Sequence, residues 1–293
     1  MRLRSRHKRG DRTVVLVETD PHGGHQWGLL NPETVLKDNG KKPYRPRLRE
    51  MQEHLHEVRT THLTKVAGLA DGCRVVYINL GDVTNGKKYP EQLVTTRLSD
   101  QSEIAAWNMR PVMDGLNVAV ARFMVGTSAH NAGEASLDID AIAKIRLFYP
   151  ELDIAVHEHG LYTVDSVEFD CAHHGPGPGI RDWTRGNVAR LYLKDRMVQD
   201  LKRGVVPAKA YLRGHHHQLV IVRHDELWGD RLYSAMLIIV PGDCGMSEHA
   251  RQVSQSQFIQ RNGRVAFEIT DGYLTPEPLL LWETLDLRIK ERL

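Results

Sequence analysis

The chain has 293 residues, of which 41% are hydrophobic and 26% charged, a composition typical of a soluble globular protein. Lys and Arg (39) nearly balance Asp and Glu (37), so the net charge of +2 makes no general case for a protein that coats nucleic acid. No apolar run approaches the roughly 18 residues of a membrane-spanning helix, and three widely spaced cysteines argue against a disulfide framework. We therefore expect a soluble protein that contacts no membrane and resides in a reducing compartment, the cytoplasm.

The two ends of the chain are expected to lie outside the main fold. Residues 1–12 are rich in Lys and Arg and lack an apolar stretch, so they predict a basic flexible tail. Its alternative role is a weak nucleic-acid contact. The main domain is predicted over residues 13–275, followed by a C-terminal helix or tail over residues 276–293, where a contact between subunits stays open.

In the first half of the chain, apolar runs alternate with segments of helical spacing. Each predicted strand stops at a short polar or glycine-containing turn, the most pronounced being Asp20-Pro21-His22 and Gly81-Asp82. We expect Pro111 to end or kink its helix and Ser136 to cap the next one. The predicted strands cover residues 13–19, 73–80 and 118–125, and the predicted helices cover 49–69, 102–116 and 136–148.

The second half is richer in short β segments. Strands are predicted over residues 153–156, 161–164, 167–171, 208–212, 219–223, 232–239 and 265–269, with one long helix over 183–203. A chain that alternates strand and helix early and is mostly β late favours a layered α/β fold, with sheets covered by helices.

Residues that bind metals gather where the predicted strands end. Ligands in layered α/β proteins collect at the carboxyl ends of strands, where loops are held by a rigid sheet. The clusters are Asp20 with His22, Asp82, the segment Gly126 to His130, His173 with His174, and His215 with His217. Asp together with imidazole suits zinc, manganese, iron or nickel better than calcium. There are more ligands than one tetrahedral site needs, which favours two ions bridged by a carboxylate, and Asp82 is the natural bridge.

Neighbouring residues on an extended segment point to opposite sides, so His173 and His174 are not expected to reach one ion together. His173 is the preferred ligand, and His174 stays open as the alternative.

This ordered set resembles the calcineurin-like metallophosphoesterases, which carry D-x-H, G-D, G-N-H-[DE], a lone H and G-H-x-H in that order. The resemblance covers roughly residues 13 to 240. It implies a layered α-β-β-α sandwich and an enzyme that hydrolyses phosphomonoesters or phosphodiesters. A dinuclear centre of Mn²⁺, Zn²⁺, Fe²⁺ or Ni²⁺ would activate water for in-line attack on phosphorus. The implied ligands are Asp20, His22, Asp82, His173 or His174, His215 and His217.

The third motif departs from the family. This chain has Gly126-Thr127-Ser128-Ala129-His130, which resembles a G-T-x-x-H variant of some phage-encoded members. The asparagine that ligates the second ion is missing, and the candidates to replace it are Thr127, Asn131 and Asn85. His130, together with the bridging Asp82, is expected to serve catalysis. Arg213 and His25 are the expected substrate contacts.

Three hypotheses about the function stay open. The first is a dinuclear phosphoesterase acting on a nucleotide or nucleic acid in a bacterial or phage-infected host cell. The second keeps the fold but loses catalysis, so that the chain acts as a binding or assembly module, because the third motif lacks its asparagine. A third is a mononuclear metal hydrolase of another fold, which leaves several ligands unused.

Overall fold

The computed structural model describes residues 12–37, 42–128, 136–179, 182–246 and 259–291, and all statements below concern these residues. The largest sheet has seven strands in the order β13-β12-β1-β4-β5-β6, with β14 also pairing with β12. Strands β1, β4, β5 and β6 run parallel, and β12 is antiparallel to β1. The bounds are β1 Arg12–Glu18, β4 Arg74–Asn79, β5 Val118–Met124, β6 Asp153–His157, β12 Ile259–Thr270, β13 Tyr273–Leu274 and β14 Leu279–Asp286.

The second sheet has five strands in the order β10-β11-β9-β8-β7. Strands β8, β9 and β11 are parallel, and the outer strands β7 and β10 are antiparallel to their neighbours. The bounds are β7 His159–Val164, β8 Val167–Ala172, β9 Ala210–Arg213, β10 Val220–Trp228 and β11 Arg231–Ile239, and a separate small hairpin joins β2 Leu36–Lys37 to β3 Pro43–Tyr44.

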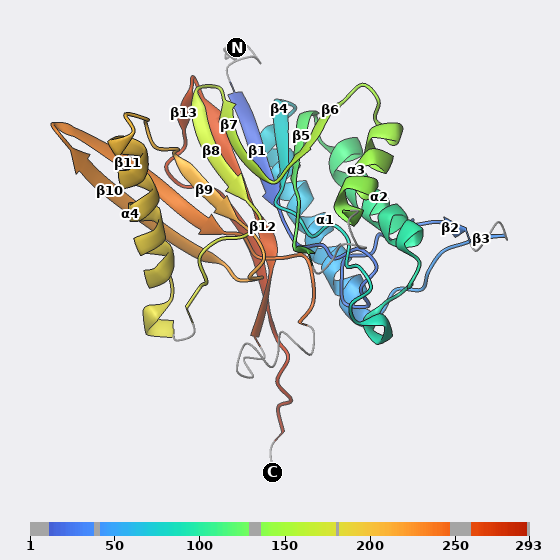
Figure 1. Ribbon diagram of the computed structural model, residues 1–293. Helices are drawn as coiled ribbons and strands as arrows, with labels where there is room; N and C mark the ends of the chain where they lie inside the picture. The colour runs from blue at the N-terminus through green and yellow to red at the C-terminus, as the bar shows by residue number, and fades with distance from the viewer. Residues whose placement is uncertain (1–11, 38–41, 129–135, 180–181, 247–258, 292–293) are drawn as a thin grey trace, which may run out of the picture.

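The two sheets pack face to face with helices outside them (Figure 1). Along β1 the side chains alternate: Val15 and Val17 belong to the apolar core between the sheets, and Val14 and Leu16 to the core on the other face. Residues of α1, α2 and α3 complete that second core, and α4 packs on the outer face of the five-stranded sheet. The predicted layered α-β-β-α sandwich is confirmed. The helices are α1 Glu50–Ala70, α2 Leu98–Gly115, α3 Leu137–Phe148 and α4 Asn187–Lys202, with 3₁₀ turns at Pro90–Gln92 and Asp182–Thr184.

Pro111 was expected to end or kink its helix, and it does not end it. Helix α2 continues to Gly115. A proline leaves the carbonyl four residues earlier without its helical donor. That carbonyl belongs to Trp107, and it accepts a hydrogen bond from the side-chain amide of Asn31 instead (2.9 Å). A tertiary contact therefore replaces the lost helical bond.

The C-terminal segment was expected to be a helix or tail, and it contains a strand instead. Strand β14 pairs antiparallel with β12 over eight residue pairs, and Leu281 enters the core beneath the helices. The sandwich therefore extends beyond residue 275.

Two helix starts also differ from the prediction. The Ser136 side chain makes no capping bond to α3, and α4 begins at Asn187 rather than Trp183. No helix in the described ranges is long and apolar enough to cross a bilayer.

Candidate metal centre

The loops that follow β1, β4, β5, β8 and β9 meet at one edge of the sandwich. Backbone hydrogen bonds join the first two: Asp20 N donates to Gly81 O, and His22 N donates to Asp82 O, each at 3.0 Å. The loop after β9 is joined to the loop after β8, since Gly214 N donates to His173 O (3.0 Å). The convergence expected from the strand ends is therefore present.

Most of the candidate ligands have an unusual backbone conformation. Positive φ angles are uncommon outside glycine and cluster at functional sites. Here they occur at Asp20 (53°), His22 (43°), Asp82 (51°), His215 (69°) and His217 (51°). The surrounding structure therefore holds these residues in turns that point their side chains inward.

Asp20, His22 and His217 form one half of the cluster, which we call the Asp20 half. The Oδ1 atom of Asp20 lies 3.8 Å from Nε2 of His22 and 3.6 Å from Nε2 of His217, and the two imidazole nitrogens are 3.2 Å apart. Asp20 Oδ2 accepts bonds from the Thr19 hydroxyl (2.6 Å) and the His215 amide (3.0 Å). Asp20 Oδ1 is buried and has no hydrogen-bond partner.

An unsatisfied buried carboxylate oxygen is costly, and a cation placed among the three side chains would remove that cost. Bonds of about 2.0–2.2 Å to an ion put neighbouring ligand atoms roughly 3.0–3.6 Å apart. The 3.2 Å and 3.6 Å separations fall in that range, and the 3.8 Å one slightly exceeds it. The residues present therefore fit a divalent metal ion.

Asp82, Thr127, His173 and His215 form the other half, which we call the Thr127 half. The Thr127 hydroxyl oxygen lies 3.1 Å from Asp82 Oδ2, 3.1 Å from His173 Nε2 and 3.2 Å from His215 Nδ1. The Thr127 amide also donates to Asp82 Oδ1 (2.6 Å). Thr127, one of the three candidates for the missing asparagine, therefore lies within this group.

The two halves share a boundary. One oxygen or nitrogen from each of Asp20, Asp82 and His173 lies within 4.8 Å of the others. Asp82 Oδ2 is 3.1 Å from His173 Nε2, and Asp20 Oδ1 is 4.0 Å from the same nitrogen. Two carboxylates thus lie between two sets of imidazoles, as a bridged pair of ions requires.

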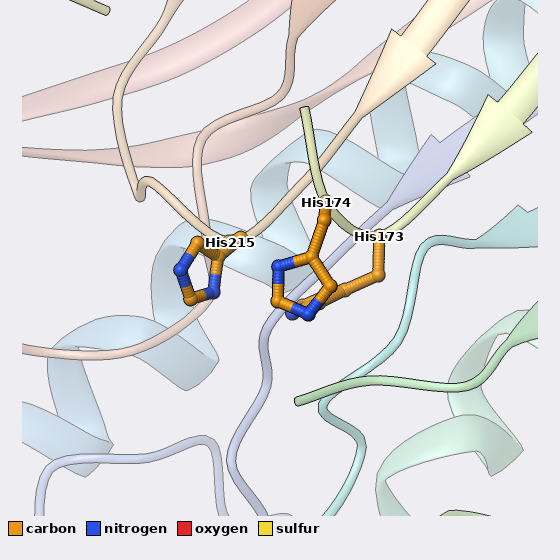
Figure 2. Close-up of side chains that lie close together, drawn as sticks. All are labelled: His173, His174 and His215. Atoms are coloured by element: carbon orange, nitrogen blue, oxygen red, sulfur yellow. The ribbon is translucent and has the colours of Figure 1, made fainter. Parts of the chain in front are cut away.

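His173 is better positioned than His174 to act as a ligand. His173 is fully buried, and its Nδ1–H donates to the Leu80 carbonyl (2.7 Å), which leaves Nε2, 3.1 Å from Asp82 Oδ2, as the nitrogen that could ligate an ion. His174 is exposed, but contrary to expectation one ring nitrogen of each of His173, His174 and His215 lies within 4.8 Å of the others, so the three could hold one ion together. Figure 2 shows the three imidazoles lying together. His174 therefore borders the centre on its open side.

The protonation of these imidazoles follows from their surroundings. Burial disfavours a charge on His173, but Asp82 and Asp20 outweigh it and raise the pKa of its imidazole to about 9. Burial and the neighbouring His173 lower the pKa of His215 to about 4. The cluster thus combines a strong attraction for a cation with a neutral imidazole able to ligate one.

Three further residues were expected at the site: His25, His130 and Asn131. The ring of His25 is buried, with Nε2 3.2 Å from Gln92 Oε1 and Nδ1 accepting from the Trp27 amide (3.1 Å). His130 and Asn131 lie outside the described residues, so their roles stay predictions.

Arg213 faces away from any substrate position. Its guanidinium is fully buried and donates to Asp170 Oδ1 (2.6 Å) and to the Tyr192 hydroxyl (3.1 Å). The residue is the last of β9, so its side chain packs between the sheet and α4 rather than following the loop. Arg213 is therefore a structural ion-pair residue, and we drop it as a phosphate contact.

Sequence reasoning missed Asp138, a buried acid in the first turn of α3. It also gave no special weight to Gly126, where a Cβ atom would lie 1.9 Å from Asp82 Oδ1. Only glycine fits at such a close approach. The sequence does indicate this position, because Gly126 directly follows a predicted strand. Asp138 has no such sequence signal, since an acid in the first turn of a helix is ordinary.

No family model matches the chain, and no curated protein matches it. Among solved structures, the chain is similar to a metallophosphoesterase from Sphaerobacter thermophilus, with 10% identity, 94% of this chain and 89% of that chain covered, and a TM-score of 0.32. It is also similar to a 5'-nucleotidase from Candida albicans, with 11% identity, 80% and 46% covered, and a TM-score of 0.37. A third is a Thermotoga maritima protein solved by solution NMR, with 11% identity, 60% and 87% covered, and a TM-score of 0.28. We therefore base the functional assignment on the geometry of the metal centre.

Proposed function

We propose that this protein is a metal-dependent phosphoester hydrolase of the calcineurin-like metallophosphoesterase type, with a dinuclear centre. One observation carries the proposal: the Asp20–Asp82–His173 group adjoins two further groups that could each hold a metal ion, Asp20–His22–His217 and His173–His174–His215. The order of these residues along the chain, each at the end of a strand, supports the same family. A mononuclear hydrolase would leave one of the two sets unused.

In this proposal Asp20, His22, Asp82 and His217 hold the first ion, and Asp82, Thr127, His173 and His215 hold the second. Two divalent ions supply charge neutralisation of the phosphate oxygens and acidification of water at neutral pH. The chain's own residues orient the centre: Leu80 O fixes the ring of His173, and the His215 amide fixes Asp20.

Two histidines are proposed to face the substrate. His174 is the exposed imidazole beside the Thr127 half and is placed to donate a hydrogen bond to a phosphate oxygen. His130 is proposed from the sequence to give a proton to the leaving oxygen, the task of a general acid.

We propose a nucleotide or nucleic acid as the substrate. The segment from Lys42 to Arg49 supports this choice, because it exposes four basic side chains and Tyr44 without an intervening acid. One of them, Arg45, pairs with Glu33 at 2.7 Å, and within the described residues the others form no ion pair that would compete with backbone phosphates. Whether the ester is a monoester or a diester is decided by assay.

The test combines metal analysis with assays on an aryl phosphate and a bis-aryl phosphate. We expect two metal ions per chain and turnover that falls by at least about 10³-fold in Asp82→Asn, because the bridge between the ions loses its charge. Asp230→Asn, at the exposed turn between β10 and β11, is the matched control and should retain full activity.

Other outcomes separate the rival functions. A folded protein that binds two ions but turns over no phosphoester would identify a binding or assembly module. Full activity with one ion per chain would overturn the dinuclear centre.

A further inference from the structure

Asp138 lies behind the metal centre without belonging to it. It occupies the first turn of α3 and is only 2% exposed. Its Oδ1 accepts hydrogen bonds from the amide (3.2 Å) and the hydroxyl (3.0 Å) of Thr84, and its Oδ2 accepts one from the amide of Gly126 (3.0 Å). One carboxylate therefore joins the loop after β4 to the loop after β5.

Both loops carry ligands of the Thr127 half. Thr84 is two residues from Asp82, and Gly126 directly precedes Thr127. The loops lie in close contact at this point, since a Cβ atom on Gly126 would lie 2.3 Å from the Asp82 amide nitrogen. A small movement of Gly126 would therefore shift the Thr127 hydroxyl relative to Asp82.

The chemistry of the three bonds requires a carboxylate. All three partners are donors, and an ionised carboxylate accepts on both oxygens. An asparagine would present an N–H group to either Gly126 or Thr84, so at least one bond would become a contact between two donors. In the described part of the chain no Lys or Arg forms an ion pair with Asp138, and burial together with Asp82 raises its pKa to about 6.

We propose that Asp138 is a positioning residue for the Thr127 half of the metal centre. It sets the distance between Asp82 and Thr127 and thereby the affinity of that half for its ion. The Asp20 half is held by other bonds, from Thr19 and His215 to Asp20, and does not depend on Asp138. This inference rests on the dinuclear centre proposed above.

The experiment titrates the metal-free protein with Mn²⁺ by calorimetry and follows aryl phosphate hydrolysis against Mn²⁺ concentration. In Asp138→Asn we expect one site of unchanged affinity and a second site weakened about 10- to 100-fold, as for other groups that orient ligands. Activity should fall at low Mn²⁺ and recover at saturating Mn²⁺, which a general loss of structure would not produce.

Asp140→Asn is the matched control, because Asp140 lies on the same helix and bonds instead to the Ser102 hydroxyl (2.6 Å). It should titrate like the wild type. Thr84→Val is the milder second variant, which removes one bond to Asp138 and should weaken the same site about 5-fold. If Asp138→Asn does not fold, the Mn²⁺ titration of Thr84→Val tests the role of Asp138.

An unchanged titration in either folded variant, or equal weakening of both sites, would overturn the role of Asp138. A wild-type protein that binds fewer than two ions would instead contradict the dinuclear centre itself.

Discussion

Glu18 and Asp20 are two residues apart, both are buried, and their surroundings are opposite. The carboxylate of Glu18 is paired with Arg59 (2.8 Å) and Arg264 (2.8 Å) and accepts a bond from the Tyr77 hydroxyl (2.9 Å). Asp20 has imidazoles around it and one oxygen without a hydrogen-bond partner.

The two regions differ in the source of the positive charge that compensates the buried carboxylate. Burial alone would raise the pKa of Glu18, but Arg59 and Arg264 outweigh it and lower the pKa to about 2. Arg264 also donates to both oxygens of Asp243 (2.8 and 2.9 Å). The Glu18 network therefore has its countercharge within the chain, whereas the Asp20 cluster fits a cation from outside. A buried acid is a candidate ligand when its countercharge is missing.

The largest effect is expected from breaking the complete network. Arg264→Met should lower the free energy of unfolding by about 3–5 kcal/mol, because it leaves Glu18 and Asp243 buried with less countercharge. Urea unfolding of the metal-free protein measures it. Arg223→Met, which removes an exposed pair with Glu277, is the control and should cost less than about 1 kcal/mol. A similar small loss for Arg264→Met would contradict the distinction between the two regions.

The pH dependence of stability should carry the signature of Glu18. Its pKa falls from 4.5 to about 2 on folding, so its contribution is fully present above 4.5 and is lost as the pH drops toward 2. The loss amounts to about 3 kcal/mol over that window. Unfolding curves of the metal-free protein and of Glu18→Gln at a series of pH values test it. The variant should show a shallower decline, and parallel curves would exclude Glu18 as the source.

Metal binding should stabilise the protein through the candidate ligand cluster and not through the Glu18 network. At a free Mn²⁺ concentration about 100 times the dissociation constant, the wild type should gain about 2.7 kcal/mol per site. Thermal unfolding with and without Mn²⁺ measures the gain. Asp20→Asn should lose the gain from the first site, while Glu18→Gln, destabilised at the start, should keep the gain from both sites. Equal gains in both variants would show that Mn²⁺ binds elsewhere.

Thr127 should give the smallest effect. Thr127→Val keeps the shape but removes the hydroxyl from the Thr127 half, so the second ion should bind about 10-fold more weakly, roughly 1.4 kcal/mol. Thr127→Asn, which introduces the family's residue, should restore the affinity. Calorimetric titration with Mn²⁺ distinguishes them, and a valine variant that binds like the wild type would exclude the hydroxyl as a ligand.

The sequence predicted those parts of the fold and site that depend on local pattern. The β-branched runs before Asp20 and Asp82 predicted buried strands, and the polar residues after them predicted where the loops would meet. Asp138 and the pairing of Arg264 with Glu18 depend on contacts between distant segments, and no local pattern reports them. Arg213 was wrongly predicted to contact substrate. It is the last residue of its strand, so its side chain packs beneath the sheet, and only the next residue lies in the loop. Which side chains hold the ions stays a prediction.

The left-handed turns at Asp20, His22, Asp82, His215 and His217 limit how these positions can be substituted. Asparagine and aspartate enter this conformation more readily than other side chains, and a β-branched residue is strained there. A valine or threonine at His22 or His217 should therefore strain the loop as well as remove the imidazole, whereas asparagine should remove the imidazole with less strain.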